Sequence, residues 1–132
     1  MRALFREYRA SLGSAGDHIV GFEEEVERLP GGYDVVLVTG ADGCVGVRRL
    51  DDRACEMKRL YVRPSARGTG AGRALAAAAV EEARGRGYAV MRLDTLPSMA
   101  AAGSLYRSLG FTEIERYNDN SAQGVRFMEL RL

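Results

Sequence analysis

The sequence predicts a mixed α/β fold, a single domain over residues 1–132 with a central mixed β-sheet and about four helices. The chain length is usual for one domain, and 46% hydrophobic with 28% charged residues is an ordinary globular composition. Segments with a helical period alternate with short β-rich segments in the order ααβββαβαββ. The strand–helix–strand unit over 54–95 predicts a right-handed parallel crossover.

Two helices are expected first. Apolar residues at helical spacing predict a helix over residues 3–12, and a second helix over 22–29 ends at Pro30-Gly31-Gly32. The second helix carries an acidic outer face between Glu23 and Glu27. Such a run attracts a cationic substrate in some proteins, but it is more often a solvated helix face.

Three short strands follow, at 35–39, 44–50 and 54–63, the last two joined by a turn at Asp51-Asp52. After a glycine-rich segment, apolar spacing predicts a helix that ends at Gly85 or Gly87. The remaining expected elements are a strand at 88–95, a helix from the cap residue Ser98 to Leu109 with Gly110 at its C′ position, and closing strands near 111–116 and 125–131.

The register of a two-residue turn places Cys44 opposite Arg59 and Cys55 opposite Arg48, so we expect the two cysteines to be unbonded. Free thiols are typical of a reducing cytoplasm, which is the expected location. A single histidine, His18, and two separated cysteines do not form a metal site.

Charge and hydropathy exclude two classes of partner. Nineteen basic and 18 acidic residues give a net charge of +1, so no broad basic surface for a nucleic acid is expected. No apolar run reaches the length of about 18 residues that a membrane span needs, and the start of the chain does not resemble a signal peptide.

The most informative segment is Arg67–Arg73, which follows a strand and opens a helix. Its glycines at alternate positions allow backbone N–H groups to converge on an anion, and the helix N-terminus adds positive potential. Arg67 and Arg73 flank the segment and can pair with phosphates. The segment therefore predicts a pyrophosphate site; the alternative is a glycine-rich turn that only starts a helix.

The glycine spacing distinguishes among phosphate loops. In the dinucleotide pattern G-x-G-x-x-G, the third glycine position falls on Arg73 or on Leu75. The P-loop ending Gly-Lys-Ser/Thr is missing because the segment has no lysine. Both mismatches disfavour an enzyme that uses a nucleotide.

The pattern R-G-x-G-x-G resembles instead the coenzyme A loop of the GNAT N-acetyltransferase superfamily. Two other stretches resemble this superfamily in the same order, E-M-K-R-L-Y-V-R-P over 56–64 and A-G-S-L-Y-R-S-L-G-F over 102–111. The resemblance extends from about residue 33 to the end of the chain.

This resemblance implies a GNAT-like fold whose parallel strands 54–63 and 88–95 splay apart, with acetyl-CoA (coenzyme A) as the cofactor. The pantetheine would lie in the gap, and a backbone N–H near Leu60 or Tyr61 would stabilise the oxyanion. Met99 stands where many members have an asparagine that touches the cofactor. The residues expected to bind the cofactor are Leu60, Tyr61, Val62, Arg67, Gly68, Thr69, Gly70, Ala71, Gly72, Arg73, Met99 and Ala102.

Two catalytic residues are expected. By resemblance, Tyr106 protonates the departing sulfur, since a tyrosine stays protonated at neutral pH; the alternative is a core tyrosine. Glu56 is the candidate general base for the amine, directly or through water. The alternative for Glu56 is an ion pair with one of its neighbours Arg48, Arg49 or Arg59.

One departure concerns the start of the fold. Members of the superfamily usually begin with a strand before the first helix, whereas this chain starts at the helix. Either this start is truncated or misassigned, or the protein lacks that strand, and in the last case residues 35–39 form an exposed apolar sheet edge. We expect a second copy of the chain to cover this edge in a homodimer.

The expected activity is N-acetyl transfer from acetyl-CoA to a primary amine of a small molecule or peptide, by direct attack in a ternary complex. The alternative is a non-catalytic acyl-CoA-binding module, which would not need Tyr106 or Glu56. By resemblance, residues 2–29 and 117–124 shape the acceptor pocket. Its candidate lining residues are His18, Glu23, Tyr33, Tyr117 and Asn118.

Overall fold

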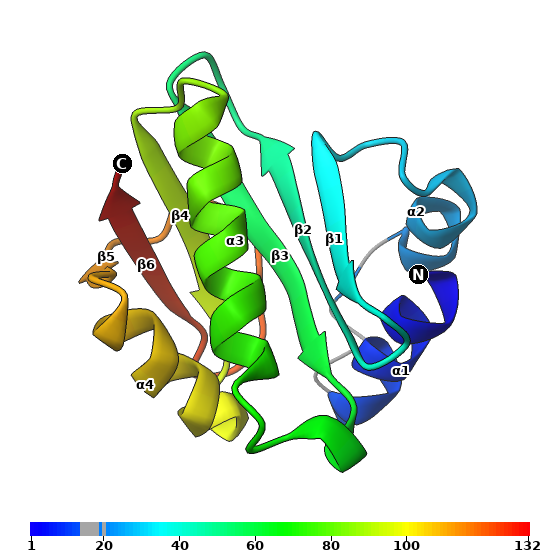
Figure 1. The fold of residues 1–132 in the computed structure, drawn as a ribbon. Coiled ribbons are helices and arrows are strands. Elements are labelled where there is room, and N and C mark those ends of the chain that lie inside the picture. The colour runs from blue at the N-terminus through cyan, green and yellow to red at the C-terminus, as the bar shows by residue number, and fades with distance from the viewer. Residues whose placement is uncertain (14–18, 20) are drawn as a thin grey trace.

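A six-stranded sheet with helices on both faces makes up the computed structural model, which describes residues 1–13, 19 and 21–132 (Figure 1). The helices are α1 (Arg2–Ser11), α2 (Phe22–Arg28), α3 (Ala71–Gly85) and α4 (Ala100–Ser108). The strands are β1 (Val35–Thr39), β2 (Gly43–Arg49), β3 (Ala54–Val62), β4 (Val90–Thr95), β5 (Thr112–Ile114) and β6 (Arg126–Arg131).

The sheet is mixed, with the strand order β1-β2-β3-β4-β6-β5. β3 and β4 are parallel and are connected through α3, whereas the other neighbouring pairs are antiparallel. The predicted fold class is therefore confirmed, including the parallel crossover. Among the described residues, no helix is both long enough and apolar enough to cross a membrane.

Two hydrophobic clusters hold the layers together. α3 and α4 cover one face of the sheet, where residues such as Ala76, Leu93 and Tyr106 are buried (Figure 1). α1 and α2 lie on the opposite face, where Phe5 and Val26 are fully buried. Burying apolar side chains on both faces of the sheet is the main stabilising contribution in such a fold.

The parallel strands β3 and β4 stay together for only part of their length. Their ladder runs from Ala54 opposite Val90 to Glu56 opposite Arg92, and the described residues show no β3–β4 pair beyond it. β4 instead keeps its pairing with β6 as far as Thr95. The two strands thus splay apart towards their carboxyl ends, as expected.

A β-bulge marks the same part of β3. Between the pairs Gly46–Lys58 and Cys44–Tyr61, two steps along β2 match three along β3. Arg59 lies in this extra stretch and has a φ of 60°, a left-handed conformation that is uncommon outside glycine. The extra residue reverses the alternation of side chains, so Tyr61 faces the same side as Lys58.

The predicted register of the β2–β3 hairpin is wrong. Cys44 lies opposite Tyr61 rather than Arg59, and Cys55 lies opposite Arg49 rather than Arg48. The turn is one residue longer than expected because Asp51 Oδ1 accepts bonds from the N–H groups of residues 53 and 54, and the bulge adds a further shift.

Both cysteines are free, as predicted, and both are buried. Burial raises the pKa of each thiol to about 12, so neither is a reactive thiolate at neutral pH.

The expected start of α4 also needs correction. Its N-cap residue is Met99 rather than Ser98, because a 3₁₀ turn over Pro97–Met99 comes first and Met99 N–H donates to the carbonyl of Leu96 at 2.9 Å. The end of α4 agrees with the prediction. Gly110 has a φ of 102°, which suits the left-handed C′ position.

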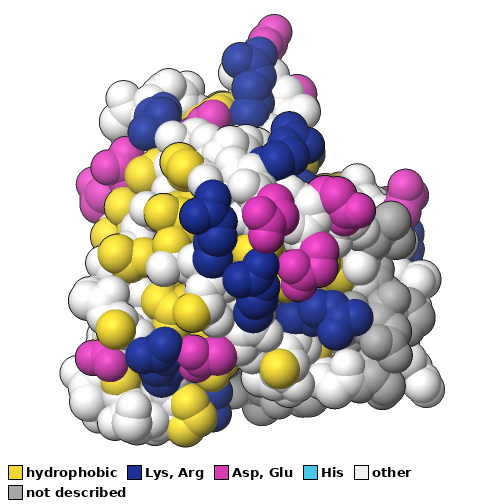
Figure 2. All heavy atoms as spheres, turned by 90° about the vertical axis from the view of Figure 1, so that its right-hand side faces the viewer, with side chains coloured by type: hydrophobic (Ala, Val, Ile, Leu, Met, Phe, Trp, Pro, Cys, Tyr) yellow, Lys and Arg dark blue, Asp and Glu magenta, His cyan; other side chains and the backbone are white. Residues whose placement is uncertain are grey.

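The acidic run on α2 has arginine partners. Glu23 and Glu27 lie on the exposed surface, where Arg6 of α1 bonds to them at 3.3 and 3.2 Å. Figure 2 shows basic and acidic side chains beside one another on this side of the molecule. Glu25 is the exception, because it turns inward to Arg59. The solvated-face interpretation thus holds for the two outer residues.

Candidate functional site

An open groove of about 410 Å³ runs beside the carboxyl end of β3. Seven of the twelve predicted cofactor-binding residues line it, and much of the wall is apolar. The lining residues are Ser11, Leu12, Leu60, Tyr61, Val62, Arg67, Gly72, Met99, Ala101, Ala102 and Leu105.

The glycine loop lies next to this groove and leads into α3. Gly68 and Gly70 have φ values of 79° and 87°, which only glycine adopts readily. Gly70 is the N-cap of the 15-residue α3, and no side chain caps this helix. The first N–H groups of α3 therefore remain available to an anion. A Cβ on Gly72 would lie 3.7 Å from Cγ2 of Val62, inside the groove.

The remaining predicted loop residues stay exposed or half-buried around these glycines. Arg67 Nε donates to the carbonyl of Val62 at 3.0 Å, and its guanidinium lies 5.9 Å from the ring centre of Tyr61. Arg73 donates to Ser108 Oγ. Thr69 donates to a carbonyl within the loop, and Ala71 begins α3. Both arginines keep further N–H donors in fork geometry.

A narrow neck of about 20 Å³ lies where β3 and β4 splay apart. Leu60 and Met99 line both the groove and the neck, so the two spaces adjoin. Tyr106 lines the neck from α4 and is buried against Phe111, with ring centres 5.8 Å apart. Burial, reinforced by Tyr8 and Asp94, raises the pKa of Tyr106, so its hydroxyl stays protonated at neutral pH.

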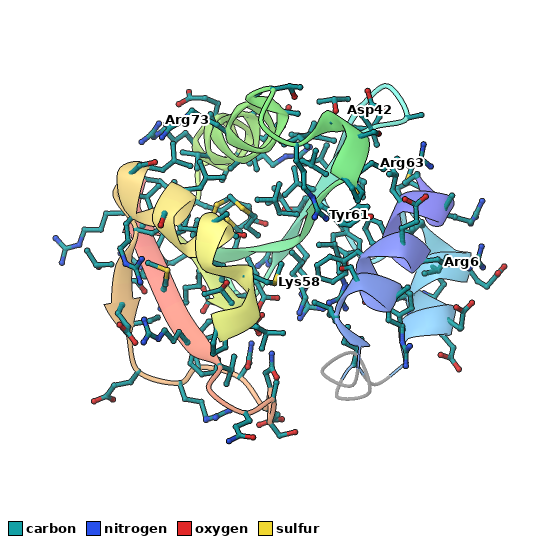
Figure 3. All side chains as sticks on the ribbon, turned by 90° about the horizontal axis from the view of Figure 1, so that it is seen from below. Arg6, Asp42, Lys58, Tyr61, Arg63 and Arg73 are labelled. Carbon is teal, nitrogen blue, oxygen red and sulfur yellow. The ribbon has the colours of Figure 1, made fainter. Side chains whose placement is uncertain are left out.

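A larger cavity of about 280 Å³ opens from the other end of the neck. Lys58 and Tyr61 lie between α4 on one side and α1 on the other (Figure 3). The polar or charged residues that line the cavity are Tyr8, Glu25, Arg48, Lys58, Arg59, Asp94, Thr95, Asn118, Asp119 and Asn120. Lys58, Asp94 and Thr95 also line the neck, so groove, neck and cavity adjoin one another in a row past the end of β3.

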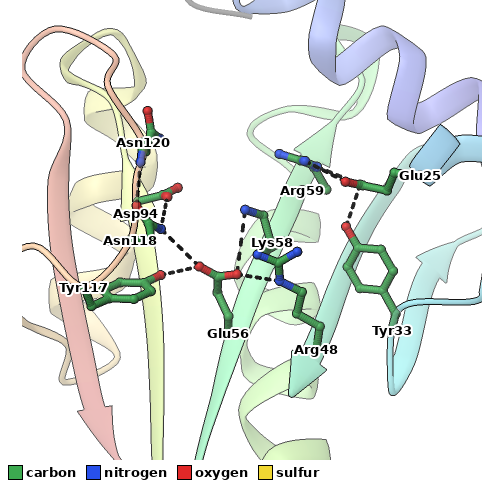
Figure 4. Close-up of polar contacts among 10 residues, drawn as sticks. All are labelled: Glu25, Tyr33, Arg48, Glu56, Lys58, Arg59, Asp94, Tyr117, Asn118 and Asn120. Atoms are coloured by element: carbon green, nitrogen blue, oxygen red, sulfur yellow. Dashed lines mark hydrogen bonds and ion pairs between the residues drawn. The ribbon is translucent and has the colours of Figure 1, made fainter. Parts of the chain in front are cut away.

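Glu56 is at the centre of a polar network next to the cavity (Figure 4). Its side chain is only 1% exposed. Oε1 accepts a bond from Arg48 Nε at 2.7 Å and lies 3.7 Å from Lys58 Nζ. Oε2 accepts bonds from the Tyr117 hydroxyl and from Asn118 Nδ2 at 3.4 Å. The ion-pair alternative for Glu56 is thus present, with Arg48, its cross-strand neighbour.

A second buried ion pair joins α2 to the bulge in β3. Glu25 accepts two bonds from Arg59, at 3.0 and 2.9 Å, and a third from the Tyr33 hydroxyl at 2.6 Å. Burial alone would raise the pKa of Glu25, but the hydrogen bonds and charge of Arg59 outweigh it and the net shift is downward. The pair therefore keeps Arg59 in place in its left-handed conformation.

The predicted acceptor-pocket residues separate in the structure. Asn118 lines the cavity, whereas Tyr117 bonds to Glu56, Tyr33 bonds to Glu25 and Glu23 lies on the exposed surface. His18 lies outside the described residues.

Sequence reasoning missed Lys58, Asp94 and Arg48 as residues of the site. One available signal was that Lys58 is the only lysine of the chain. Another was that Asp94 is a charged residue at the carboxyl end of a parallel strand, between positions that bury Leu93 and Thr95.

Comparison with known proteins places these features in a family. A family model described as the acetyltransferase (GNAT) domain matches residues 17–113. A Schizosaccharomyces pombe protein named as an uncharacterised N-acetyltransferase is 41% identical over 91 residues, which cover 68% of this chain and 56% of that protein. The matched part of this chain thus spans little more than half of that relative.

Solved structures show the same architecture. A candidate acyl-CoA N-acyltransferase from Klebsiella pneumoniae has a TM-score of 0.77 at 26% identity, covering 98% of this chain and 90% of that one. A candidate acetyltransferase from Salmonella typhimurium, solved with its cofactor acetyl-CoA, has a TM-score of 0.64 at 28% identity, covering 85% and 74%.

Proposed function

The chain belongs to the GNAT acetyltransferase family, and on that premise we propose that it transfers the acetyl group of acetyl-CoA to a primary amine of a small molecule or peptide. The observation that carries the proposal is the path of adjoining spaces from the groove, past the neck, to the polar cavity, which share lining residues. Two substrates that enter from opposite ends of this path meet at the neck, which is the geometry that direct transfer needs.

The groove fits coenzyme A. Its apolar wall suits a pantetheine arm, and the uncapped N-terminus of α3 with Gly68 and Gly70 suits a diphosphate. Arg67 and Arg73 would add charged donors at the loop. The Salmonella relative, solved with acetyl-CoA, supports this assignment. When bound, acetyl-CoA supplies a thioester whose C–S bond breaks as the new N–C bond forms, so that coenzyme A leaves as a thiol.

The neck supplies the groups around that exchange. The bulge at Arg59 removes the regular pairing of β3 next to Leu60, and the Leu60 N–H is our candidate oxyanion donor. Tyr106 holds a proton in the same neck and is our candidate for donating it to the leaving sulfur. The proton lost by the amine and the proton gained by the thiol balance over the cycle.

Two carboxylates compete for the role of accepting the amine proton. Glu56 is the candidate from sequence, but both of its oxygens already accept bonds and four donors surround it. Asp94 lines both the neck and the cavity, and Asn118 donates to its Oδ2 at 2.8 Å. We therefore propose that Asp94 orients the amine and accepts its proton, and that Glu56 fixes Arg48 and Lys58.

The edge of the sheet supports a homodimer as part of the proposal. β1 pairs only with β2 among the described strands, and Val38 on β1 is 47% exposed. An unpaired apolar edge readily pairs with another strand. We propose that a second copy of the chain covers it.

Thermal unfolding with four ligands tests the proposed cofactor. Acetyl-CoA, coenzyme A, NAD and ATP are each added at about 1 mM. A ligand at 100 times its Kd stabilises the folded state by about 2.7 kcal/mol, which raises Tm by several degrees in a domain of this size. We expect a shift with acetyl-CoA and coenzyme A and none with NAD or ATP. No shift with either coenzyme A species would refute the proposed function.

A further inference from the structure

The floor of the polar cavity carries more hydrogen-bond donors than acceptors. Arg48 and Lys58, on the neighbouring strands β2 and β3, both line the cavity and both approach Oε1 of Glu56. Of the guanidinium donors of Arg48, only Nε–H has a partner among the described residues, and the side chain is 38% exposed. Its two terminal nitrogens form a planar fork of N–H donors.

The ammonium group of Lys58 has even fewer partners than the guanidinium of Arg48. Its side chain is 14% exposed, and its ammonium makes no hydrogen bond within 3.5 Å to any residue that the structure describes. Among the described residues its one ion-pair partner is Glu56, whose Oε1 lies 3.7 Å from Nζ and already accepts the shorter bond from Arg48. Burial lowers the pKa of Lys58, and Glu56 only partly opposes this shift. A buried cation with unused donors is costly unless another acceptor completes its shell.

The other charges around the cavity have partners or are exposed. Arg59 is paired with Glu25 through two hydrogen bonds. Asp94 lies on the opposite wall, on β4, bonded to Asn118, and Asp119 is exposed. The floor therefore has two cations and the single carboxylate of Glu56, which leaves a surplus of one positive charge. On the wall opposite the floor, Asp94 provides one negative charge (Figure 4).

We propose that the amine acceptor also carries a carboxylate, as an amino acid does, and that Arg48 and Lys58 bind this carboxylate while Asp94 faces the amine. The inference rests on the proposed function and names the substrate class of the same site. One carboxylate matches the surplus of one positive charge, and the fork of Arg48 matches its two oxygens. Lys58 and Arg48 are then specificity-determining residues.

The same arrangement disfavours the other amine classes. A diamine or polyamine would place a second cation against Arg48 and Lys58, and like charges in a partly buried site repel. A peptide amino terminus lacks the α-carboxylate next to its amine, because that carboxyl group is part of the first peptide bond. The cavity of about 280 Å³ is at the small end of ligand pockets, which suits a small zwitterion.

Binding of reaction products, without any cofactor, tests this proposal first. A panel of N-acetyl-L-amino acids and their carboxamides is titrated by calorimetry into the wild-type chain and four variants. The carboxamide keeps the shape of the acid and removes its charge. We expect at least one acid to bind to the wild-type chain. Its carboxamide should bind with an affinity about tenfold or more lower. The acid itself should bind to Arg48→Met and to Lys58→Met with an affinity that is also about tenfold or more lower. Arg49→Met is the matched control, because Arg49 pairs with Asp52 outside the cavity, and its affinity should equal that of the wild type.

Three results would overturn the proposal: no binding by any acid of the panel, equal binding of acids and carboxamides, or wild-type affinity in both cavity variants. Thermal unfolding without ligand checks that each variant folds. Lys58→Arg, which keeps the charge, should retain more affinity than Lys58→Met. Arg48→Met provides an independent test on a more exposed residue.

Thiol release from acetyl-CoA then links the site to transfer. With amino acids as acceptors, Lys58→Met should raise KM about tenfold or more with a smaller change in kcat, since it removes a binding contact. A diamine used in preference to every amino acid would overturn the inference and leave the proposed acetyl transfer standing. Failure to bind acetyl-CoA would refute the proposed function, whereas the product titration would still decide the inference.

Discussion

At the scale of single residues, the site combines groups that the sequence identifies with groups that only the fold brings together. The glycines of the loop, Leu60 and Tyr106 follow from local motifs, and the structure places Gly72 and Leu60 at the groove and Tyr106 at the adjoining neck. The charged floor could not be predicted in this way. Lys58 and Asp94 are distant in sequence, and they face one another across the neck where the neighbouring strands β3 and β4 splay apart.

The role of Tyr106 gives the first prediction. Tyr106→Phe removes the hydroxyl but keeps the ring packed on Phe111, so we expect kcat about tenfold or more lower with little change in coenzyme A affinity. Stopped-flow thiol detection gives kcat, and calorimetry gives the affinity. Equal losses in both quantities would indicate a packing role instead.

The choice between Asp94 and Glu56 gives the second prediction. A general base works only when ionised, so activity declines as the pH falls below its pKa. We expect Asp94→Asn to lose this acidic limb from the pH profile of kcat/KM, and Glu56→Gln to keep it. Profiles with the opposite outcome would assign the base role to Glu56.

At the scale of elements, the order and type of the helices and strands were predictable, but the details at β3 were not. Hydrophobic periodicity places each strand within a few residues of its observed position. It contains no signal for the bulge at Arg59, whose side chain pairs with Glu25 of α2, a residue 34 positions away in sequence. The predicted register of the β2–β3 hairpin is wrong because the bulge shifts the pairing and because Asp51 lengthens the turn.

The Glu25–Arg59 pair predicts how stability depends on pH. The pKa of Glu25 is below its usual value of 4.5 in the folded chain. A lowered carboxyl pKa contributes stability that is fully present above the unfolded pKa and is lost as the pH falls through the folded one. We therefore expect Tm to decline below about pH 4.5 in the wild type, and less steeply in Glu25→Gln.

Truncation of the Glu25 side chain shows how much the pair contributes to the free energy of unfolding. Glu25→Ala leaves the buried guanidinium of Arg59 unpaired and should lower the free energy of unfolding by about 3–5 kcal/mol at neutral pH. Urea denaturation measures this change. Glu23→Ala, on the exposed face of the same helix, is the control and should cost less than about 1 kcal/mol. Similar losses in the two variants would contradict the assigned role of the pair.

At the scale of the whole molecule, the fold and the family were predictable because three motifs occur in the right order on one sheet. The acceptor class was not predictable from sequence. The class that we propose is inferred from the balance of charges across a cavity whose walls come from α1, α2, three neighbouring strands and the loop around Asn118. Family membership supports the proposed reaction type, and we expect the charges of this particular cavity to select the substrate.

The exposed edge gives a prediction about assembly. β1 with exposed Val38 should pair with a second copy, so sedimentation at about 0.1 mM should show a dimer. Val38→Lys places a charge on this edge and should shift the chain towards monomer. A strictly monomeric wild-type chain at that concentration would contradict the proposed homodimer.

The most direct test of the central claim is mass spectrometry of the products formed from acetyl-CoA and a pool of amino acids and diamines. We expect free coenzyme A together with an N-acetylated amino acid, both strongly reduced in Tyr106→Phe. Acetyl-CoA that stays intact with every amine of the pool, while the folded chain binds it, would contradict the account.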